Sequence, residues 1–321
     1  MIEYIITFLL LTAVGYLYDK YRSKMDVYDE TENEILIREY LLNETYTPNN
    51  KPPLWIYVNS ETNSRNWSSF GSRSNNDLNQ PYLYITLRSI INRSNNDFNV
   101  CIINDNSIHK LLPAWSIDLH KLAEPCKSHY RDLALAKILY NYGGFVVPPT
   151  YLALNDLYEL YYTGIQNKGC FVCELPSDSV LTGVKNTQPS MKFMGCTKQH
   201  PNVKDLCNKL EKVNSKDYTM EQDFDGSIER ILNDYIMKGT IHKVGGKIVG
   251  SLDKYNEPIT IHELLGSSYI DFCDNIHGIY IPQNDILIRS KYQWFARSSE
   301  EQIYKGTTII GKYMLTSNNY D

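Results

Sequence analysis

The chain has 321 residues, of which 42% are hydrophobic and 21% charged, values of ordinary globular proteins that exclude wholesale disorder and fibrous repeats. Its 32 Lys and Arg against 37 Asp and Glu give a net charge of −5, which argues against a nucleic-acid coat protein. The length suits one large α/β domain, or two small ones that share a core. Composition therefore indicates a class of fold and no function.

The N-terminus holds an apolar run over residues 2–17, followed by Lys20, Arg22 and Lys24. This run is shorter than the roughly 20 residues that cross a bilayer comfortably, and it fits a marginal single span or a signal anchor. The basic flank predicts, by the positive-inside rule, that the domain behind it faces the cytosol. An amphipathic first helix packed on the domain is the alternative. We favour a single-pass membrane anchor over residues 1–24.

The seven cysteines agree with a cytosol-facing domain, because they are scattered and odd in number, as expected for reduced thiols. Cys170 and Cys173 form a lone C-x-x-C within an apolar stretch. With no second pair and no nearby histidine pair, buried cysteines are a better interpretation than zinc or redox chemistry. The seven histidines form neither H-x-x-x-H nor H-E-x-x-H, so no metal site is expected.

Strands alternate with helices after a polar segment at 25–51, which includes a helix expected at 32–42. Short apolar runs bounded by turn residues predict buried strands, and apolar positions three or four apart predict helices. Their alternation predicts an α/β fold with a mostly parallel sheet flanked by helices. Strands are expected at 54–58, 98–103, 144–147 and 169–174, and helices at 81–91, 127–142 and near 157–162. The part from 193 to 321 is expected to be an elaborated α+β region with helices near 203–210 and 227–237.

The most informative segment is residues 127–150, KSHYRDLALAKILYNYGGFVVPPT. It predicts an amphipathic helix that ends at Gly143-Gly144 and is followed at once by a strand. Gly143 at the end of a helix tolerates the left-handed conformation that reverses the chain. Gly144 would let a backbone or a ligand approach closely.

This segment resembles the glycosyltransferases of family 32 and the related capsular polysaccharide synthesis proteins, which have the GT-A fold. Their pattern is D-x-x-R, six residues, then Y-G-G-x-Y-x-D-x-D; Asp132 matches the aspartate, and Tyr142-Gly143-Gly144 match the Y-G-G. The strands at 54–58 and 101–106 look like the family's donor-side strands. The resemblance covers roughly residues 52–175 and implies a domain over 52–321 that binds a nucleotide sugar. The candidate donor-binding residues are Asn104, Asp105, Arg131, Asp132, Gly143 and Gly144.

Two departures from the family pattern bear on the chemistry. Leu135 stands where the family has the arginine of D-x-x-R, and Pro148-Pro149-Thr150 stand where it has D-x-D. The D-x-D carboxylates bind a divalent cation that neutralises the charge developing on the leaving diphosphate. Prolines and a hydroxyl cannot do so. We therefore expect no divalent metal and no other cofactor, with a nucleotide sugar as a potential ligand.

Three side chains near these positions have a functional and a structural interpretation each. Asp132 could accept hydrogen bonds from donor hydroxyls, or be a first-turn carboxylate favoured by the helix dipole. Arg131 could bind a diphosphate, although a surface ion pair is the better interpretation. Asp156 could be a displaced metal ligand, although an N-cap of the next helix is favoured.

Two aromatic and basic segments are candidates for interaction with partners. Arg65, Trp67 and Arg73 lie in a polar loop after the first strand. Trp294 and Arg297 lie in residues 291–297, for which a half-buried strand with charged ends is the simpler interpretation. The glycine-rich run at 243–250 lacks phosphate-loop spacing, and Gly245-Gly246 predict a hairpin turn.

Two functions are consistent with these patterns. As a whole, the chain also looks like anchored, uncharacterised proteins of giant DNA viruses. The favoured function is a catalytically degenerate glycosyltransferase-fold protein of a virion or host membrane, which acts as a minor capsid or membrane-associated component. Its partners would be the membrane and viral capsid or membrane proteins, with no nucleic acid. The alternative is an active transferase that uses Arg131 or other cations in place of the metal.

Overall fold

The computed structural model describes residues 35–36, 39–42, 46, 50–58, 80–176, 187–216 and 221–318. Residues 1–40 and 41–321 form separate units, and the sheet belongs to the second. The expected anchor at 1–24 and the candidates Arg65, Trp67 and Arg73 lie outside the described residues. No helix in the described part has the length and apolar character to cross a membrane. The helix expected at 32–42 is too long, because Leu41 forms a parallel bridge with Ile102.

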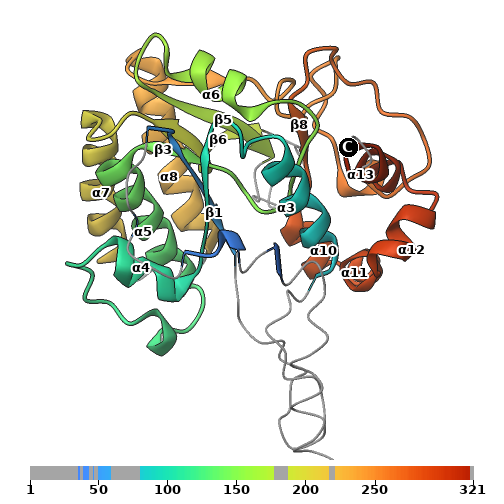
Figure 1. The fold of residues 1–321 in the computed structure, drawn as a ribbon. Coiled ribbons are helices and arrows are strands. Elements are labelled where there is room, and N and C mark those ends of the chain that lie inside the picture. The colour runs from blue at the N-terminus through green and yellow to red at the C-terminus, as the bar shows by residue number, and fades with distance from the viewer. Residues whose placement is uncertain are drawn as a thin grey trace, which may run out of the picture. The chain divides into compact units, whose positions relative to one another are not determined.

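Within the described residues, six strands form one sheet in the order β2-β1-β3-β6-β5-β7. Figure 1 labels four of them, β1, β3, β5 and β6. Parallel pairs join β1 to β2 and β3, and β5 to β7, whereas β6 runs antiparallel to β3 and β5. The mostly parallel sheet expected from the sequence is confirmed; the reversed β6 was not predicted. The strands are β1 (Pro53–Tyr57), β2 (Asn99–Ile103), β3 (Gly144–Val146), β5 (Cys170–Pro176), β6 (Thr187–Cys196) and β7 (His242–Val244).

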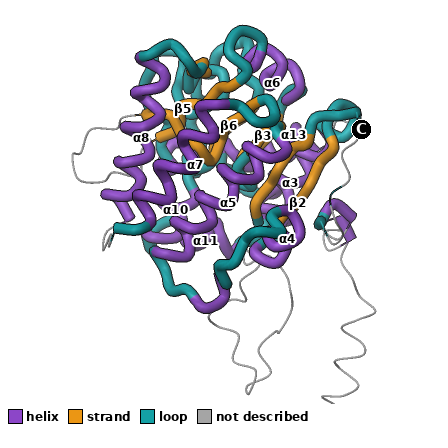
Figure 2. The backbone as a smooth tube through the Cα atoms, turned by 90° about the vertical axis from the view of Figure 1, so that its left-hand side faces the viewer, coloured by secondary structure: helices purple, strands orange, loops and turns teal. Residues whose placement is uncertain are grey.

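Helices cover both faces of this sheet. One layer contains α4 (Asp105–Leu111), α5 (Cys126–Tyr142), α7 (Pro201–Asn214) and α8 (Glu221–Met237), with the 3-10 turn η1 (Leu119–Lys121) beside α4. Figure 2 faces this layer and shows α5, α7 and α8 in front of the strands. The opposite layer contains α3 (Tyr82–Asn92) and α6 (Leu157–Ile165). The expected helices at 81–91, 127–142, 157–162, 203–210 and 227–237 are confirmed.

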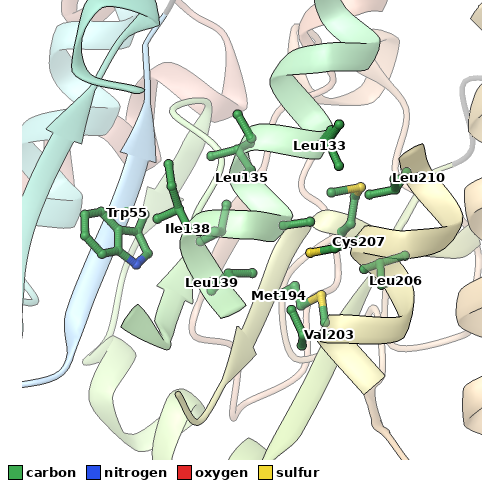
Figure 3. Packing of buried hydrophobic residues seen from close by; sticks show 14 of the residues in the cluster. Trp55, Leu133, Leu135, Ile138, Leu139, Met194, Val203, Leu206, Cys207 and Leu210 are labelled. Atoms are coloured by element: carbon green, nitrogen blue, oxygen red, sulfur yellow. The ribbon is translucent and has the colours of Figure 1, made fainter. Parts of the chain in front are cut away.

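Apolar side chains fill the space between α5, α7 and the sheet (Figure 3). Ile138 and Leu139 of α5 are fully buried together with Trp55 of β1 and Met194 of β6. Burying each aliphatic side chain of this kind contributes roughly 1.5–3 kcal/mol. The Trp55 indole N–H donates to the carbonyl of Gly143 at 2.9 Å, so this large residue also ties β1 to the end of α5.

Aromatic rings pack on the other face. The ring of Phe145 in β3 lies 5.2 Å from that of Phe171 in β5 and 5.4 Å from that of Phe193 in β6. These separations are typical of stabilising aromatic pairs. A Cβ at Gly164 of α6 would lie 2.5 Å from the Phe171 ring, so only glycine lets α6 pack this closely on β5.

The C-terminal part is α+β, as expected. A two-stranded sheet joins β4 (Tyr151–Ala153) to β8 (Gly278–Tyr280) in antiparallel pairing. The strand interpretation of 291–297 is wrong, because Gln293–Arg297 is helix α11. Its N-cap Tyr292 and its Phe295 are both buried and have helical spacing. The predicted hairpin is also wrong, because β7 pairs in parallel with β5 before the turn at Gly245. The remaining helices are α9 (Ile261–Leu264), α10 (Gln283–Ile288), α12 (Glu300–Lys305) and α13 (Ile309–Asn318).

Candidate functional site

The carboxyl ends of β1, β2 and β3 lie at one edge of the sheet, together with the amino-terminal half of α5. From β1 the chain continues to β2 on one side and then returns to β3 on the other, so the strand order changes direction at β1. In open α/β sheets, ligands bind outside the carboxyl ends of the strands at such a point. The candidates Asn104, Asp105, Arg131 and Asp132 all come to this edge.

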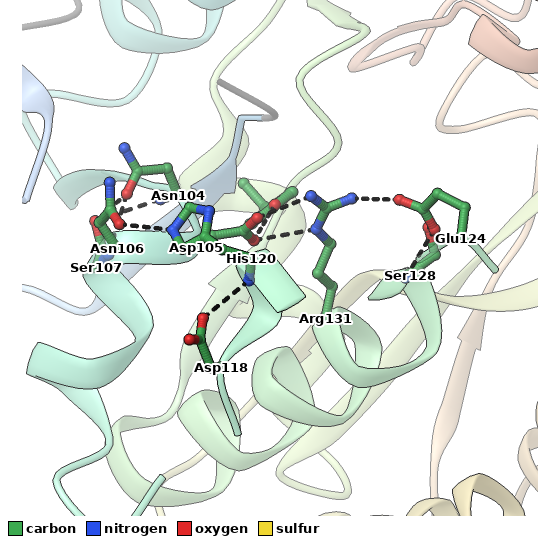
Figure 4. A network of polar contacts seen from close by, with 10 residues as sticks. Asn104, Asp105, Asn106, Ser107, Asp118, His120, Glu124, Ser128 and Arg131 are labelled. Atoms are coloured by element: carbon green, nitrogen blue, oxygen red, sulfur yellow. Dashed lines mark hydrogen bonds and ion pairs between the residues drawn. The ribbon is translucent and has the colours of Figure 1, made fainter. Parts of the chain in front are cut away.

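An ion pair joins the end of β2 to α5 (Figure 4). Arg131 donates from Nε to Asp105 Oδ1 at 3.0 Å and from Nη2 to Oδ2 at 2.8 Å. Its Nη1 donates to Glu124 Oε1 at 2.9 Å. Arg131 and Asp105 are both buried, so the surface ion pair expected for Arg131 is instead an interior one. A bidentate ion pair of this kind fixes the relative orientation of the two side chains and is stronger than a single neutral hydrogen bond.

Neighbouring groups hold Asp105 in place. The Tyr57 hydroxyl donates to Asp105 Oδ1 at 2.6 Å, and the Arg131 guanidinium lies 5.6 Å from the centroid of the Tyr57 ring. Asn104 accepts from the Ser107 N–H at 3.0 Å and caps α4. Asn104 and Asp105 are therefore used in holding the end of β2, and Arg131 would have to leave its partners to bind a diphosphate.

The ionised form of Asp105 is favoured in the folded protein. Burial alone would raise its pKa, but hydrogen bonds from Arg131 and Tyr57 and the charge of Arg131 bring the pKa below its usual range. The same contacts raise the pKa of Arg131, against the effect of burial. Both groups are charged at neutral pH.

This shift predicts a loss of stability in acid that is specific to Asp105. A carboxyl whose folded-state pKa is lowered contributes stability above its unfolded pKa of about 3.9, and loses it as the pH falls through the folded value. The unfolding free energy of wild type should therefore exceed that of Asp105→Asn at pH 7, and the difference should shrink below about pH 4. Urea titrations between pH 2 and 7 measure it. A difference that stayed constant down to pH 2 would contradict the assignment.

Asp132 lies next to Arg131 but faces a different environment. Because α5 begins at Cys126, Asp132 is in its second turn, and the first-turn interpretation is wrong. The side chain is 6% exposed and lines a cavity of about 60 Å³ between α5, α8 and the ends of β5 and β6. The charged residues of the lining are Asp132, Lys192, Asp225 and Glu229. This mainly acidic surface suits hydroxyl or amine groups better than a diphosphate.

Gly143 and Gly144 lie away from Asp132, at the opposite end of α5. The helix places Gly143 about 16 Å further along its axis. Gly144 has a φ of 97°, and a Cβ on it would lie 2.1 Å from the carbonyl oxygen of Pro53. The close approach that the sequence predicts at Gly144 is thus to a backbone of β1. The structure does not bring these glycines to the candidate site.

The residues at the D-x-D positions belong to the interior. Thr150 is 3% exposed and Pro148 is buried. The Thr86 hydroxyl of α3 donates to the carbonyl of Pro149 at 2.6 Å, and the N–H of Tyr151 donates to the carbonyl of Pro148 at 3.0 Å. This turn connects β3 to β4 and packs against α3. Leu135, at the position of the family's arginine, is buried in the apolar core.

The other candidates have structural roles or an exposed surface. Asp156 caps α6, accepting from the Tyr158 N–H at 2.8 Å, as expected. Cys170 and Cys173 are buried in β5, where burial raises the pKa of both thiols and makes the thiolates unfavourable. Trp294 on α11 is 50% exposed. Across the described ranges, no group of three or more His, Cys, Asp or Glu could hold a metal ion.

Several residues of this edge were not expected from the sequence. Tyr57 and Glu124 complete the ion pair, and Asp225 and Glu229 of α8 line the Asp132 cavity. Tyr57 is near the carboxyl end of a strand that the sequence predicts. Because ligands bind at such strand ends, this position could have indicated a nearby binding site. No pattern in the sequence points to the α8 carboxylates, because local patterns do not show that α8 lies close to α5.

Comparisons with known proteins give little further guidance. No family model matches the chain, and no curated protein matches it. Among solved structures it is similar to "PaToxG Glycosyltransferase", at 12% identity and a TM-score of 0.34, over 58% of this chain and 70% of that one. The resemblances to family 32 and to proteins of giant viruses stay predictions.

Proposed function

We propose that this protein has a glycosyltransferase-like domain that does not perform metal-dependent sugar transfer and that acts as a structural or interaction component. The observation that carries the proposal is the chemistry and the packing of Pro148-Pro149-Thr150. These residues have no carboxylate, and the buried turn that they form is hydrogen-bonded to Thr86 of α3. A metal site would need carboxylate oxygens directed at an open position. Here the residues at the D-x-D positions pack in the interior against α3.

The alternative, a transferase without metal, requires another cation at the leaving diphosphate. Arg131 is the basic side chain that the sequence offers for this role. Its guanidinium already bonds Asp105 and Glu124, and separating a buried pair leaves an uncompensated charge. This cost argues that Arg131 holds the fold together and does not stabilise a leaving group.

The proposal includes attachment to a membrane through residues 1–24, and viral capsid or membrane proteins as partners. Its supports are the apolar run at 2–17 with its basic flank, and the exposed Trp294 of α11 beside Arg297. A tryptophan with an adjacent arginine is the composition that protein interfaces enrich.

Release of nucleoside diphosphate from nucleotide sugars tests the proposal. We expect the full chain to release none above the level of a protein-free blank, with or without Mn²⁺, from UDP- and GDP-linked sugars. Asp132→Asn and the half-exposed control Asp118→Asn should be indistinguishable from wild type. Release that requires Mn²⁺, and that is lost in Asp132→Asn but kept in Asp118→Asn, would refute the proposal. Release without metal would favour the alternative.

A further inference from the structure

We infer that a second pocket, between α6 and β7, is a binding site for a neutral carbohydrate of one or two sugar units. This α6–β7 pocket has a volume of about 490 Å³, within the range of small-molecule sites. It shares no lining residue with the Asp132 cavity. Its polar lining includes Asn155, Asp156, Glu159, Thr163, His242 and His277.

One wall of the pocket is held rigidly by hydrogen bonds between two loops. The N–H groups of Leu154 and Asn155 both donate to the carbonyl of His277, at 2.9 and 3.0 Å. The Asn155 side chain donates to the carbonyl of Ile276 at 2.6 Å, and His277 Nδ1 donates to the carbonyl of Asp156 at 2.9 Å. Polar groups fixed in this way can bind a ligand without a large loss of their own conformational entropy.

The glycine-rich run at 243–250 forms the adjacent wall. Gly250 has a φ of 65°, and a Cβ on it would lie 2.2 Å from the carbonyl oxygen of Gly278. The N–H of His277 donates to the carbonyl of Ile248 at 2.8 Å. These contacts bring Ile248 into the lining of the pocket. Gly250, in the run that lacks phosphate-loop spacing, thus serves a close approach between two backbones.

The hydrogen-bonding groups suit a ligand with many hydroxyls. A carbonyl only accepts, so this hydrogen bond selects the tautomer with the proton on His277 Nδ1, in which Nε2 is an acceptor. The carboxylates of Asp156 and Glu159 accept, and the Thr163 hydroxyl both donates and accepts. Sugar hydroxyls likewise donate and accept, so they can pair with each of these groups.

The charge and the apolar residues narrow the class of ligand. Asp156 and Glu159 line the pocket, and none of the described lining residues is Lys or Arg, which disfavours phosphates and carboxylates. The described lining has no Phe, Tyr or Trp, so it lacks the aromatic cage that captures alkylammonium groups. Leu160, Val244 and Ile248 supply an apolar surface for the C–H face of a sugar ring.

Saturation-transfer NMR on the full chain tests this inference, in a detergent without a sugar headgroup. The probes are glucose, galactose, N-acetylglucosamine and maltose at millimolar concentration, with glucose 1-phosphate and spermidine as charged comparisons. We expect transfer to at least one neutral sugar. Thr163→Trp, which fills the pocket, should abolish it. Glu159→Gln should weaken binding about tenfold, since a neutral amide oxygen replaces the charged carboxylate as the acceptor.

Matched variants separate this site from others. Thr316→Trp and Glu301→Gln replace an exposed helical threonine and glutamate elsewhere, and both should bind as wild type does. Absence of transfer to every neutral sugar, transfer that persists in Thr163→Trp, or preference for glucose 1-phosphate or spermidine would each overturn the inference.

Discussion

Replacing Arg131 by methionine is expected to lower the free energy of unfolding by about 3–5 kcal/mol. Methionine keeps much of the side-chain volume but removes the charge. Asp105 is then left buried and ionised beside the neutral Tyr57 hydroxyl, without the guanidinium that neutralises it. The large effect arises from that uncompensated charge, because the intact pair itself adds little net stability over an apolar replacement. Urea denaturation followed by tryptophan fluorescence measures the change.

Two further variants show whether the buried charge is the cause. Arg289→Met breaks the exposed pair with Asp285 and should cost less than about 1 kcal/mol. Adding Asp105→Asn to Arg131→Met removes the unpaired charge, so the double variant should be more stable than Arg131→Met alone. If Arg131→Met were no worse than Arg289→Met, the ion pair would not be what holds α5 to the end of β2.

Local patterns in the sequence predicted much of the sheet and its helices. Leu54, Trp55 and Ile56 form an apolar run between turn residues, and they are the buried centre of β1. The apolar positions of α5 recur at helical spacing and face the core. The predicted bounds of this helix are therefore close to the observed ones. Such elements are determined by residues near one another in the chain. The reversed strand β6 was missed because periodicity does not show how a strand pairs. It lies antiparallel to β5, which precedes it in the chain, and to β3, which comes well before both.

The contacts of the site were harder to predict for the same reason. The sequence identified Arg131 and Asp105 as separate candidates for a ligand, but nothing local shows that they bind each other. The sequence predicted that a backbone or a ligand approaches Gly144 closely. In the structure it is the backbone of Pro53, in a strand far earlier in the chain. Asp132 is the candidate whose surroundings best fit a binding role, and its neighbours come from β6 and α8. Residue types are visible in the sequence, and their partners depend on the fold.

Replacing Gly144 by alanine is expected to destabilise the protein by about 3 kcal/mol or more, since a left-handed φ and an overpacked contact each cost roughly 1–3 kcal/mol. The added methyl group would meet the Pro53 carbonyl oxygen, which is backbone of β1 and cannot move aside without disturbing its pairing with β3. Gly226→Ala in α8 is the matched control, because its Cβ would meet nothing within 4 Å and alanine should stabilise that helix by about 0.5–1 kcal/mol. Thermal denaturation of both variants checks the opposite signs. A Gly144→Ala protein as stable as wild type would show that β1 and β3 do not approach as closely as the structure has them, and would return Gly144 to the residues available to a ligand.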